Sequence, residues 1–157
     1  MCVPPRIFEG ASTFNENIGG WDTSSVTDMG AMFRKADVFN QSLAFDTGKV
    51  AGMSRLFENA LEFNHPLNFD TRKVGSMFYA FSGTLMLNQP LAFDTSETTS
   101  LQSMFEDAKR SNQPVPFDTS SVTSITQPMY VRDHTKHKTG KFVCEIKLSS
   151  VVRVTID

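Results

Sequence analysis

Five aspartates, each followed by threonine, recur at a fixed spacing of 24 residues, and they are the carboxylates best placed for chemistry. They are Asp22, Asp46, Asp70, Asp94 and Asp118. Two carboxylates that lie close together can share a proton and act as acid and base in hydrolysis. The same residues also have a structural interpretation, because aspartate at a helix start accepts hydrogen bonds from the unpaired N–H groups of the first turn. The even spacing favours this structural role.

One of these sites, Phe45-Asp46-Thr47-Gly48, has the apolar-Asp-Thr-Gly pattern of aspartic proteases. The other four sites have a different residue in place of Gly48, namely Ser24, Arg72, Ser96 and Ser120. Protease chemistry needs two carboxylates at close range, whereas a stack of helix caps explains all five aspartates at once. We therefore expect a non-enzymatic protein, with a hydrolase that uses the Asp column as the alternative.

The histidines and cysteines offer a weaker candidate for metal binding. His134 and His137 lie three residues apart, and Cys144 follows seven residues later. Zinc needs four ligands, and the neighbouring Lys136 and Lys138 would oppose a cation. We expect a solvated basic turn here, with no metal and no cofactor, and we expect the isolated His65 to lie on the surface.

Asparagines form a second polar column, most of them preceded by an aromatic or aliphatic residue. The column consists of Asn15, Asn40, Asn64, Asn88 and Asn112. An asparagine beside a buried residue can hydrogen-bond the backbone of the adjacent turn, as in leucine-rich repeats. A ladder of ligand-binding side chains is the alternative. The threonines after the aspartates raise the idea of an ice-binding face, but charges two residues further on, such as Lys49 and Lys73, oppose it.

Apolar spacing predicts two elements in each repeat. Leu43 and Phe45, like their equivalents, are two residues apart, which is typical of a short strand with one face inward. Prolines keep three of these strands short: Pro66, Pro90 and Pro114. A spacing of three to four residues follows the aspartates, as in Val26, Met29, Phe33 and Ala36. That spacing predicts a helix of about three turns with one buried face.

These elements predict an α/β repeat fold. We expect a leucine-rich-repeat-like solenoid with a short parallel strand and a short helix in each 24-residue turn. Residues 1–6 form a leader, residues 7–129 form about five repeats, and residues 130–157 form a basic loop and a two-strand C-terminal cap. The N-terminal end has no comparable cap, which indicates a fragment or an end that stacks on a partner.

Composition narrows the classes of partner. Residues 1–129 contain 9 Lys/Arg and 14 Asp/Glu, whereas residues 130–157 contain 6 and 3. The repeats therefore lack the basic stripe typical of nucleic-acid binding. No segment approaches the roughly 20 apolar residues of a membrane-spanning helix. No signal peptide is visible at the N-terminus, so the compartment is not determined.

The unit FNENIGGWDTSSVTDMGAMFRKADVFNQ resembles a known family of repeats of about 25 residues. Such repeats occur in mycoplasma surface lipoproteins, in bacterial surface proteins related to the BspA-like leucine-rich repeats, and in microalgae and protists. The matching columns include Phe14-Asn15, Trp21-Asp22-Thr23-Ser24, Val26, Met32-Phe33 and Ala36, and the resemblance covers about residues 7–127. It implies a cell-surface or extracellular interaction module without enzyme activity.

Two non-enzymatic functions agree with these patterns. The favoured one is a protein-interaction or scaffold module, because exposed positions such as Arg34-Lys35 and Glu58-Asn59 vary between repeats while the apolar columns stay constant. The alternative is a small structural subunit of a larger assembly, which docks through its N-terminal end and its basic tail 130–157. Both predict protein partners.

Overall fold

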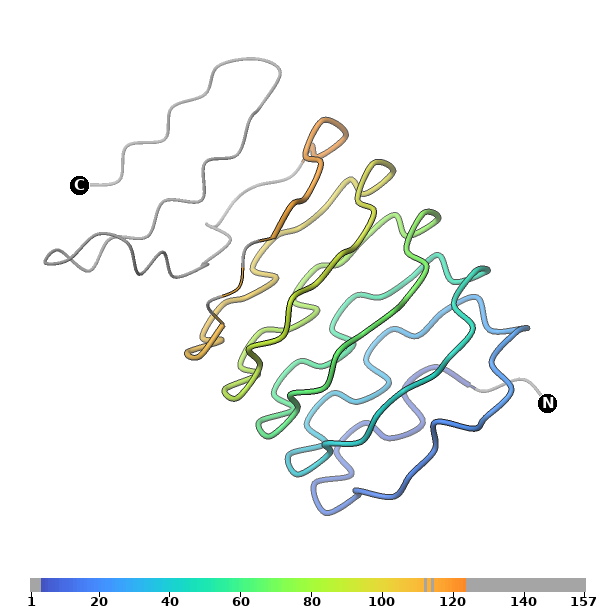
Figure 1. Cartoon of the computed structure of the whole chain (residues 1–157), viewed down its shortest axis with the longest axis vertical. Helices are drawn as coiled ribbons and strands as arrows, with labels where there is room; N and C mark the ends of the chain where they lie inside the picture. Colours follow the sequence, from blue (N-terminus) through green and yellow to red (C-terminus); the bar gives the residue numbers. More distant parts are fainter. Residues whose placement is uncertain (1–3, 112, 114, 124–157) are drawn as a thin grey trace, which may run out of the picture.

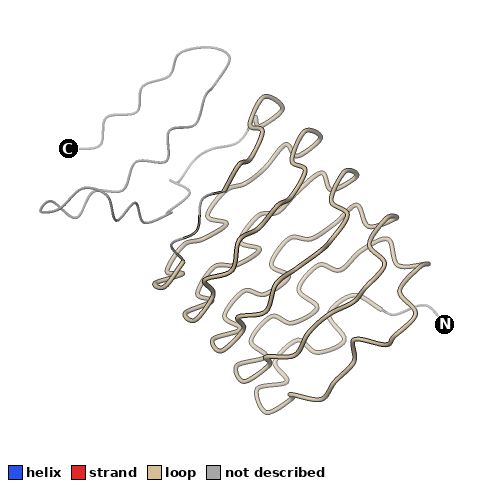
Figure 2. Ribbon diagram, in the orientation of Figure 1, coloured by secondary structure: helices blue, strands red, loops and turns tan. Residues whose placement is uncertain are grey.

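The chain winds into a stack of similar turns, each lying beside the next along one axis (Figure 1). The computed structural model describes residues 4–111, 113 and 115–123. No helix and no strand of two or more residues occurs among these residues (Figure 2). The only regular pairing in the described part is a row of isolated parallel bridges that joins Asp28, Gly52, Ser76 and Ser100.

The predicted leucine-rich-repeat-like solenoid of strand and helix is therefore wrong, although the 24-residue period of the stack agrees with the sequence. The predicted leader at residues 1–6 stays a prediction. Several other predicted features lie outside the described residues, namely the cap at 130–157, Asn112, His134, His137 and Cys144. Each turn has two halves. In the turn formed by residues 37–60, we call residues 39–47 the extended half and residues 50–60 the tight-turn half, and we use the same names for their equivalents.

The tight-turn half replaces the predicted helix because its N–H groups alternate between two kinds of acceptor. Met29, Ala31 and Phe33 donate to carbonyls of the next turn, at Gly52, Ser54 and Leu56, each at 2.9 Å. The intervening N–H groups donate three residues back within the turn, as Arg34 does to Ala31. A helix needs every N–H to reach the carbonyl four residues earlier. Half of these donors are instead used to join the turns.

Backbone dihedral angles give the second reason why no helix forms. In each of the four tight-turn halves that follow the first turn, two residues four positions apart have φ between 52° and 68°, in the left-handed region. These residues are Ala31, Lys35, Arg55, Asn59, Tyr79, Gly83, Ser103 and Asp107. The left-handed conformation costs an L-residue about 1–2 kcal/mol and ends any right-handed helix. The hydrogen bonds between turns offset that cost.

The extended half replaces the predicted strand. Leu43, Phe45 and Thr47 are buried, whereas Ala44 and Asp46 are exposed, so the predicted alternation is present. However, residues 40–46 make no backbone-to-backbone hydrogen bond with another described residue. A strand needs such a ladder with its neighbour. Side chains join the extended halves instead.

Aromatic rings fill the interior in columns along the stack axis. Phe33 stacks on Phe57 at 5.2 Å between ring centroids, and Phe57 stacks on Phe81 at 5.6 Å. Phe57 also lies 4.1 Å from Phe63, in the extended half of the following turn. All of these rings are 0–1% exposed. The columns that the sequence places inside are thus the core, even though the elements that carry them are not helices.

Candidate functional site

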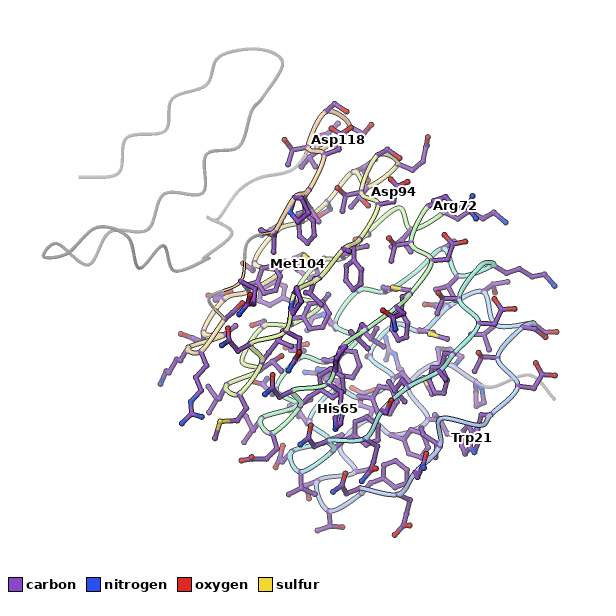
Figure 3. All side chains as sticks on the ribbon, viewed as in Figure 1. Trp21, His65, Arg72, Asp94, Met104 and Asp118 are labelled. Atoms are coloured by element: carbon purple, nitrogen blue, oxygen red, sulfur yellow. The ribbon has the colours of Figure 1, made fainter. Side chains whose placement is uncertain are left out.

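The aspartate column lies along one edge of the stack, where Figure 3 labels Asp94, Asp118 and Arg72. Each carboxylate accepts a hydrogen bond from the backbone N–H two residues later, at 2.9–3.2 Å. No helix follows, so the predicted helix caps are wrong. The aspartates instead close a short side-chain-to-backbone turn, which is a frequent role of this residue type.

Electrostatics at this edge favours ionised carboxylates. The Arg72 guanidinium donates to Asp70 at 2.7 and 3.0 Å and lowers the pKa of Asp70 to about 2. Hydrogen bonds from serine two residues later lower the pKa of the three carboxyls of Asp22, Asp94 and Asp118. Acid catalysis by a shared proton needs a carboxyl with a raised pKa. At these four sites the environment moves the pKa in the opposite direction.

The threonines that follow the aspartates link successive turns. Thr23, Thr47, Thr71 and Thr95 are 1–2% exposed. Their hydroxyls donate to the backbone carbonyls of the aspartates in the next turn, at 2.7–3.1 Å. From the sequence we considered these threonines only as a possible ice-binding face and did not predict their hydrogen bonds between turns. The invariance of threonine across all five repeats was the signal that could have revealed it.

The asparagine column also joins neighbouring turns. The side-chain oxygens of Asn15, Asn40 and Asn64 accept the backbone N–H groups of the asparagines one turn later, at 2.8–3.0 Å. Three glutamines strengthen the contact, since Gln41 donates to Asn15, Gln89 to Asn64 and Gln113 to Asn88. These asparagines supply the hydrogen bonds that the extended backbone does not make.

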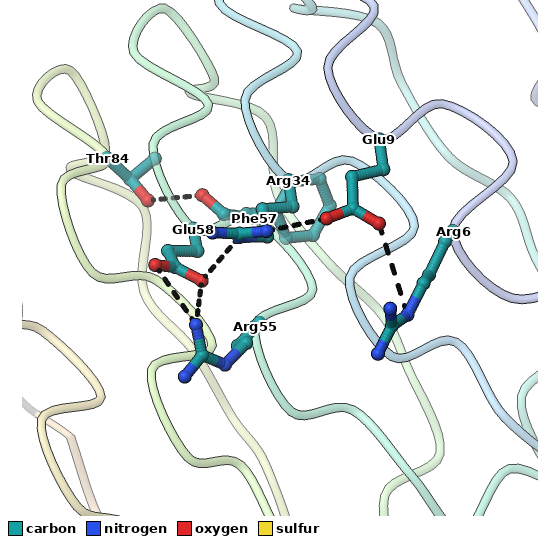
Figure 4. Close-up of polar contacts among 7 residues, drawn as sticks. All are labelled: Arg6, Glu9, Arg34, Arg55, Phe57, Glu58 and Thr84. Atoms are coloured by element: carbon teal, nitrogen blue, oxygen red, sulfur yellow. Dashed lines mark hydrogen bonds and ion pairs between the residues drawn. The ribbon is translucent and has the colours of Figure 1, made fainter.

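A charged network crosses three turns on another part of the surface (Figure 4). Arg34 donates to Glu9 at 2.6 Å and to Glu58 at 3.0 Å. Arg55 adds a second contact to Glu58 at 3.1 Å. The hydrogen bond that Arg34 donates to Glu9 raises the pKa of Arg34, and the negative charge of Glu58 acts in the same direction. From the sequence we took Arg34 and Glu58 as variable exposed positions and did not pair them. That expectation was wrong for Glu58, which is only 9% exposed, because its carboxylate turns towards the two arginines.

Two aromatic side chains adjoin this network. The Arg55 guanidinium lies 5.3 Å from the ring centroid of Phe78 and 5.4 Å from that of Tyr79. The two rings meet edge to face at 4.3 Å, and both residues are partly exposed. We call Arg34, Arg55, Glu58, Phe78 and Tyr79 the Arg55 surface. The equivalents of Phe78 in other turns are Gly30, Ser54 and Gln102, so this aromatic pair is specific to one turn.

Within the described residues, no group of three or more His, Cys, Asp or Glu side chains is arranged to hold a metal ion. His65, which Figure 3 labels, is partly buried. The described part also contains no helix long and apolar enough to cross a bilayer.

Comparison with known proteins gives one result at the level of the family. Neither the curated proteins nor the solved structures include a match to this chain. The model of the family described as "Mycoplasma protein of unknown function, DUF285" matches residues 5–68 and 43–142. These two overlapping matches cover most of the 157 residues. The chain therefore belongs to the DUF285 family.

Proposed function

We propose that this chain is a non-enzymatic protein-interaction module and that the Arg55 surface is its contact region. The observation that carries the proposal is the difference between constant buried columns and variable exposed ones. The buried column of Phe33, Phe57, Phe81 and Phe105 repeats without change. The exposed columns change from turn to turn, as expected of a surface that is adapted to a partner.

The chemistry of the Arg55 surface supports the choice of region. Arginine and aromatic residues are enriched at the centres of protein interfaces, where they contribute most of the binding energy. The rings of Phe78 and Tyr79 already hold the Arg55 guanidinium in place. A partner with an acidic or aromatic side chain could therefore contact an arginine that is partly preorganised.

The resemblance to BspA-like surface repeats agrees with an interaction module and extends the proposal to a cell-surface or extracellular location. Its finer implication, a relationship to leucine-rich repeats, also belongs to this proposal. The alternative function, a subunit of a stacked assembly, draws its support from an exposed tryptophan at the N-terminal end, Trp21, which is 38% exposed.

Affinity capture with crosslinking tests the contact region. The full chain is compared with the double variant Arg55→Ser/Tyr79→Ser, and with Lys49→Ser/Lys73→Ser as a matched control at exposed lysines of a different column. We expect the first variant to lose the captured partners and the control to retain them, with both variants melting as cooperatively as the parent chain. Equal capture by all three proteins contradicts the Arg55 surface as the contact region.

A further inference from the structure

The N-terminal edge of the stack exposes large apolar side chains whose equivalents in the inner turns are buried. We define this edge as Ile7, Phe8, Phe14, Asn15 and Trp21, and Figure 3 labels Trp21 there. Trp21 is 38% exposed and Ile7 is 41% exposed. The equivalents of Trp21 are 5–7% exposed (Phe45, Phe69 and Phe93), and those of Ile7 are 1–2% exposed (Met32, Leu56 and Ala80). Among the described residues, no preceding turn covers this edge.

Each inner turn uses a fixed set of backbone groups to form hydrogen bonds with the preceding turn, and the N-terminal edge presents the same set. The N–H of Asn40 donates to Asn15, and the carbonyl of Asp46 accepts from Thr23. Met32 and Arg34 offer their carbonyls to Phe8 and Gly10. In the first turn the equivalent N–H belongs to Asn15. The equivalent carbonyls are those of Asp22, Ile7 and Glu9. None of the four has a hydrogen-bond partner among the described residues.

We propose that the N-terminal edge binds a further turn of the same 24-residue repeat. The occupant would place rings or aliphatic side chains over Phe8, Phe14 and Trp21, at the 5.2–6.5 Å centroid spacing of the inner columns. It would also place an asparagine oxygen at the N–H of Asn15 and a threonine hydroxyl at the carbonyl of Asp22. The inference depends on the stacking geometry and is independent of the Arg55 surface.

Trp21 provides a direct measurement because it is the only tryptophan in the chain. A copy of residues 31–54 is placed before Arg6 in the full chain, in place of residues 1–5, since Arg6 is the equivalent of Arg55 and the register then continues. We expect Trp21 fluorescence to shift to shorter wavelength, and its quenching by acrylamide to fall several-fold. A control carries the same copy with its three phenylalanines (Phe33, Phe39 and Phe45) changed to serine.

If Trp21 stays exposed in the extended chain, the proposal is wrong. It is also wrong if the serine control shifts the Trp21 fluorescence by the same amount. A second measurement uses the unaltered chain and a separate peptide of residues 31–54, which contains no tryptophan. A saturable shift that Asn15→Pro weakens at least tenfold supports docking between chains. Ile7→Lys, which places a charge on the edge, should weaken the shift as well. Val38→Lys is its matched control, because Val38 is also 41% exposed but lies one turn further in, and it should leave the shift unchanged.

The two proposals can fail separately. If the N-terminal edge binds independently of the Arg55 surface, Arg55→Ser/Tyr79→Ser leaves the shift in Trp21 fluorescence unchanged. An equal shift of Trp21 fluorescence with a scrambled peptide would show non-specific apolar binding and would contradict recognition of the repeat. A shift produced by lipid vesicles but not by the added turn assigns the edge to a membrane surface and also overturns the proposal.

Discussion

The two halves of each turn are joined to their neighbours by different chemical groups. In the tight-turn half, backbone N–H groups donate to backbone carbonyls of the next turn, so most side chains on its outer surface are free to vary. In the extended half, the side chains of Asn and Thr supply the corresponding hydrogen bonds. This difference explains why Asn and Thr repeat strictly, while positions such as Arg55 and Tyr79 differ between turns.

The largest expected loss of stability comes from removing an aromatic ring, and this loss should differ between the two halves. Phe57→Ala removes a ring that is 0% exposed and touches three other rings, and should destabilise the fold by about 3–5 kcal/mol. Phe45→Ala, whose ring stacks on Phe69 at 6.5 Å, should cost less. Chemical denaturation measures both free energies of unfolding. Equal losses would mean that the two columns contribute alike.

A second prediction concerns the hydroxyl groups of the extended half. Thr71→Val keeps the side-chain volume but removes the hydrogen bond that the buried Thr71 hydroxyl donates to the carbonyl of Asp94, which should cost about 0.5–1.5 kcal/mol. Thr71→Ser keeps the hydroxyl and serves as the control. Ser54→Ala in the tight-turn half, where the backbone still joins the turns, should cost less than Thr71→Val. If Ser54→Ala lowers the free energy of unfolding as much as Thr71→Val, the two halves do not differ in their dependence on side-chain hydrogen bonds.

Backbone substitution should reverse this order of sensitivity. Gly83 has φ of 68° in the tight-turn half, and a methyl group there would meet the side-chain oxygen of Asn59. Gly83→Ala should therefore destabilise the chain by about 1–2 kcal/mol. Gly48→Ala, beside the extended half, would make only ordinary contacts of 3.4 and 3.7 Å with Asp46 and Asp70. Thermal melting of the two variants compares them, and similar melting temperatures would count against the backbone argument.

The smallest effect concerns pH. The folded-state pKa of Asp70 is about 2, below its ordinary value of 3.8, because Arg72 donates to the carboxylate. This ion pair contributes to stability above pH 3.8, and the contribution is lost as the pH falls through about 2. Arg72→Ala should raise the pKa of Asp70 towards 3.8, as an NMR titration of its carboxyl group would measure. The unfolding free energy at neutral pH should barely change, since exposed ion pairs contribute little.

The sequence predicted the core of this protein better than its elements. The columns of Phe33 and Phe45 were placed inside from their spacing, and both residues are buried. The helix was wrong because apolar residues three to four apart fit a series of tight turns as well as a helix. What distinguishes the two is the acceptor of each N–H group, which in the tight-turn half lies 23 residues further along the chain. No local pattern records such a partner.

The candidate site shows the same limit. Arg34, Glu58 and Tyr79 belong to columns that vary, so no repeated pattern connects them with one another or with Glu9. Stacking brings Glu9, Arg34 and Glu58 into contact because they occupy equivalent positions in successive turns. The 24-residue period shows that these positions are equivalent, but only the close approach of successive turns brings their side chains into contact.

The amino-acid sequence by itself determined the 24-residue period, the inward face of each repeat and the family, because these depend on residue types at fixed spacing. The tertiary structure alone decided that the turns contain neither helix nor strand among the described residues. The physical reason is competition for backbone N–H groups. A neighbouring turn offers carbonyls in register to alternate donors of the tight-turn half, and those donors are then unavailable to a helix.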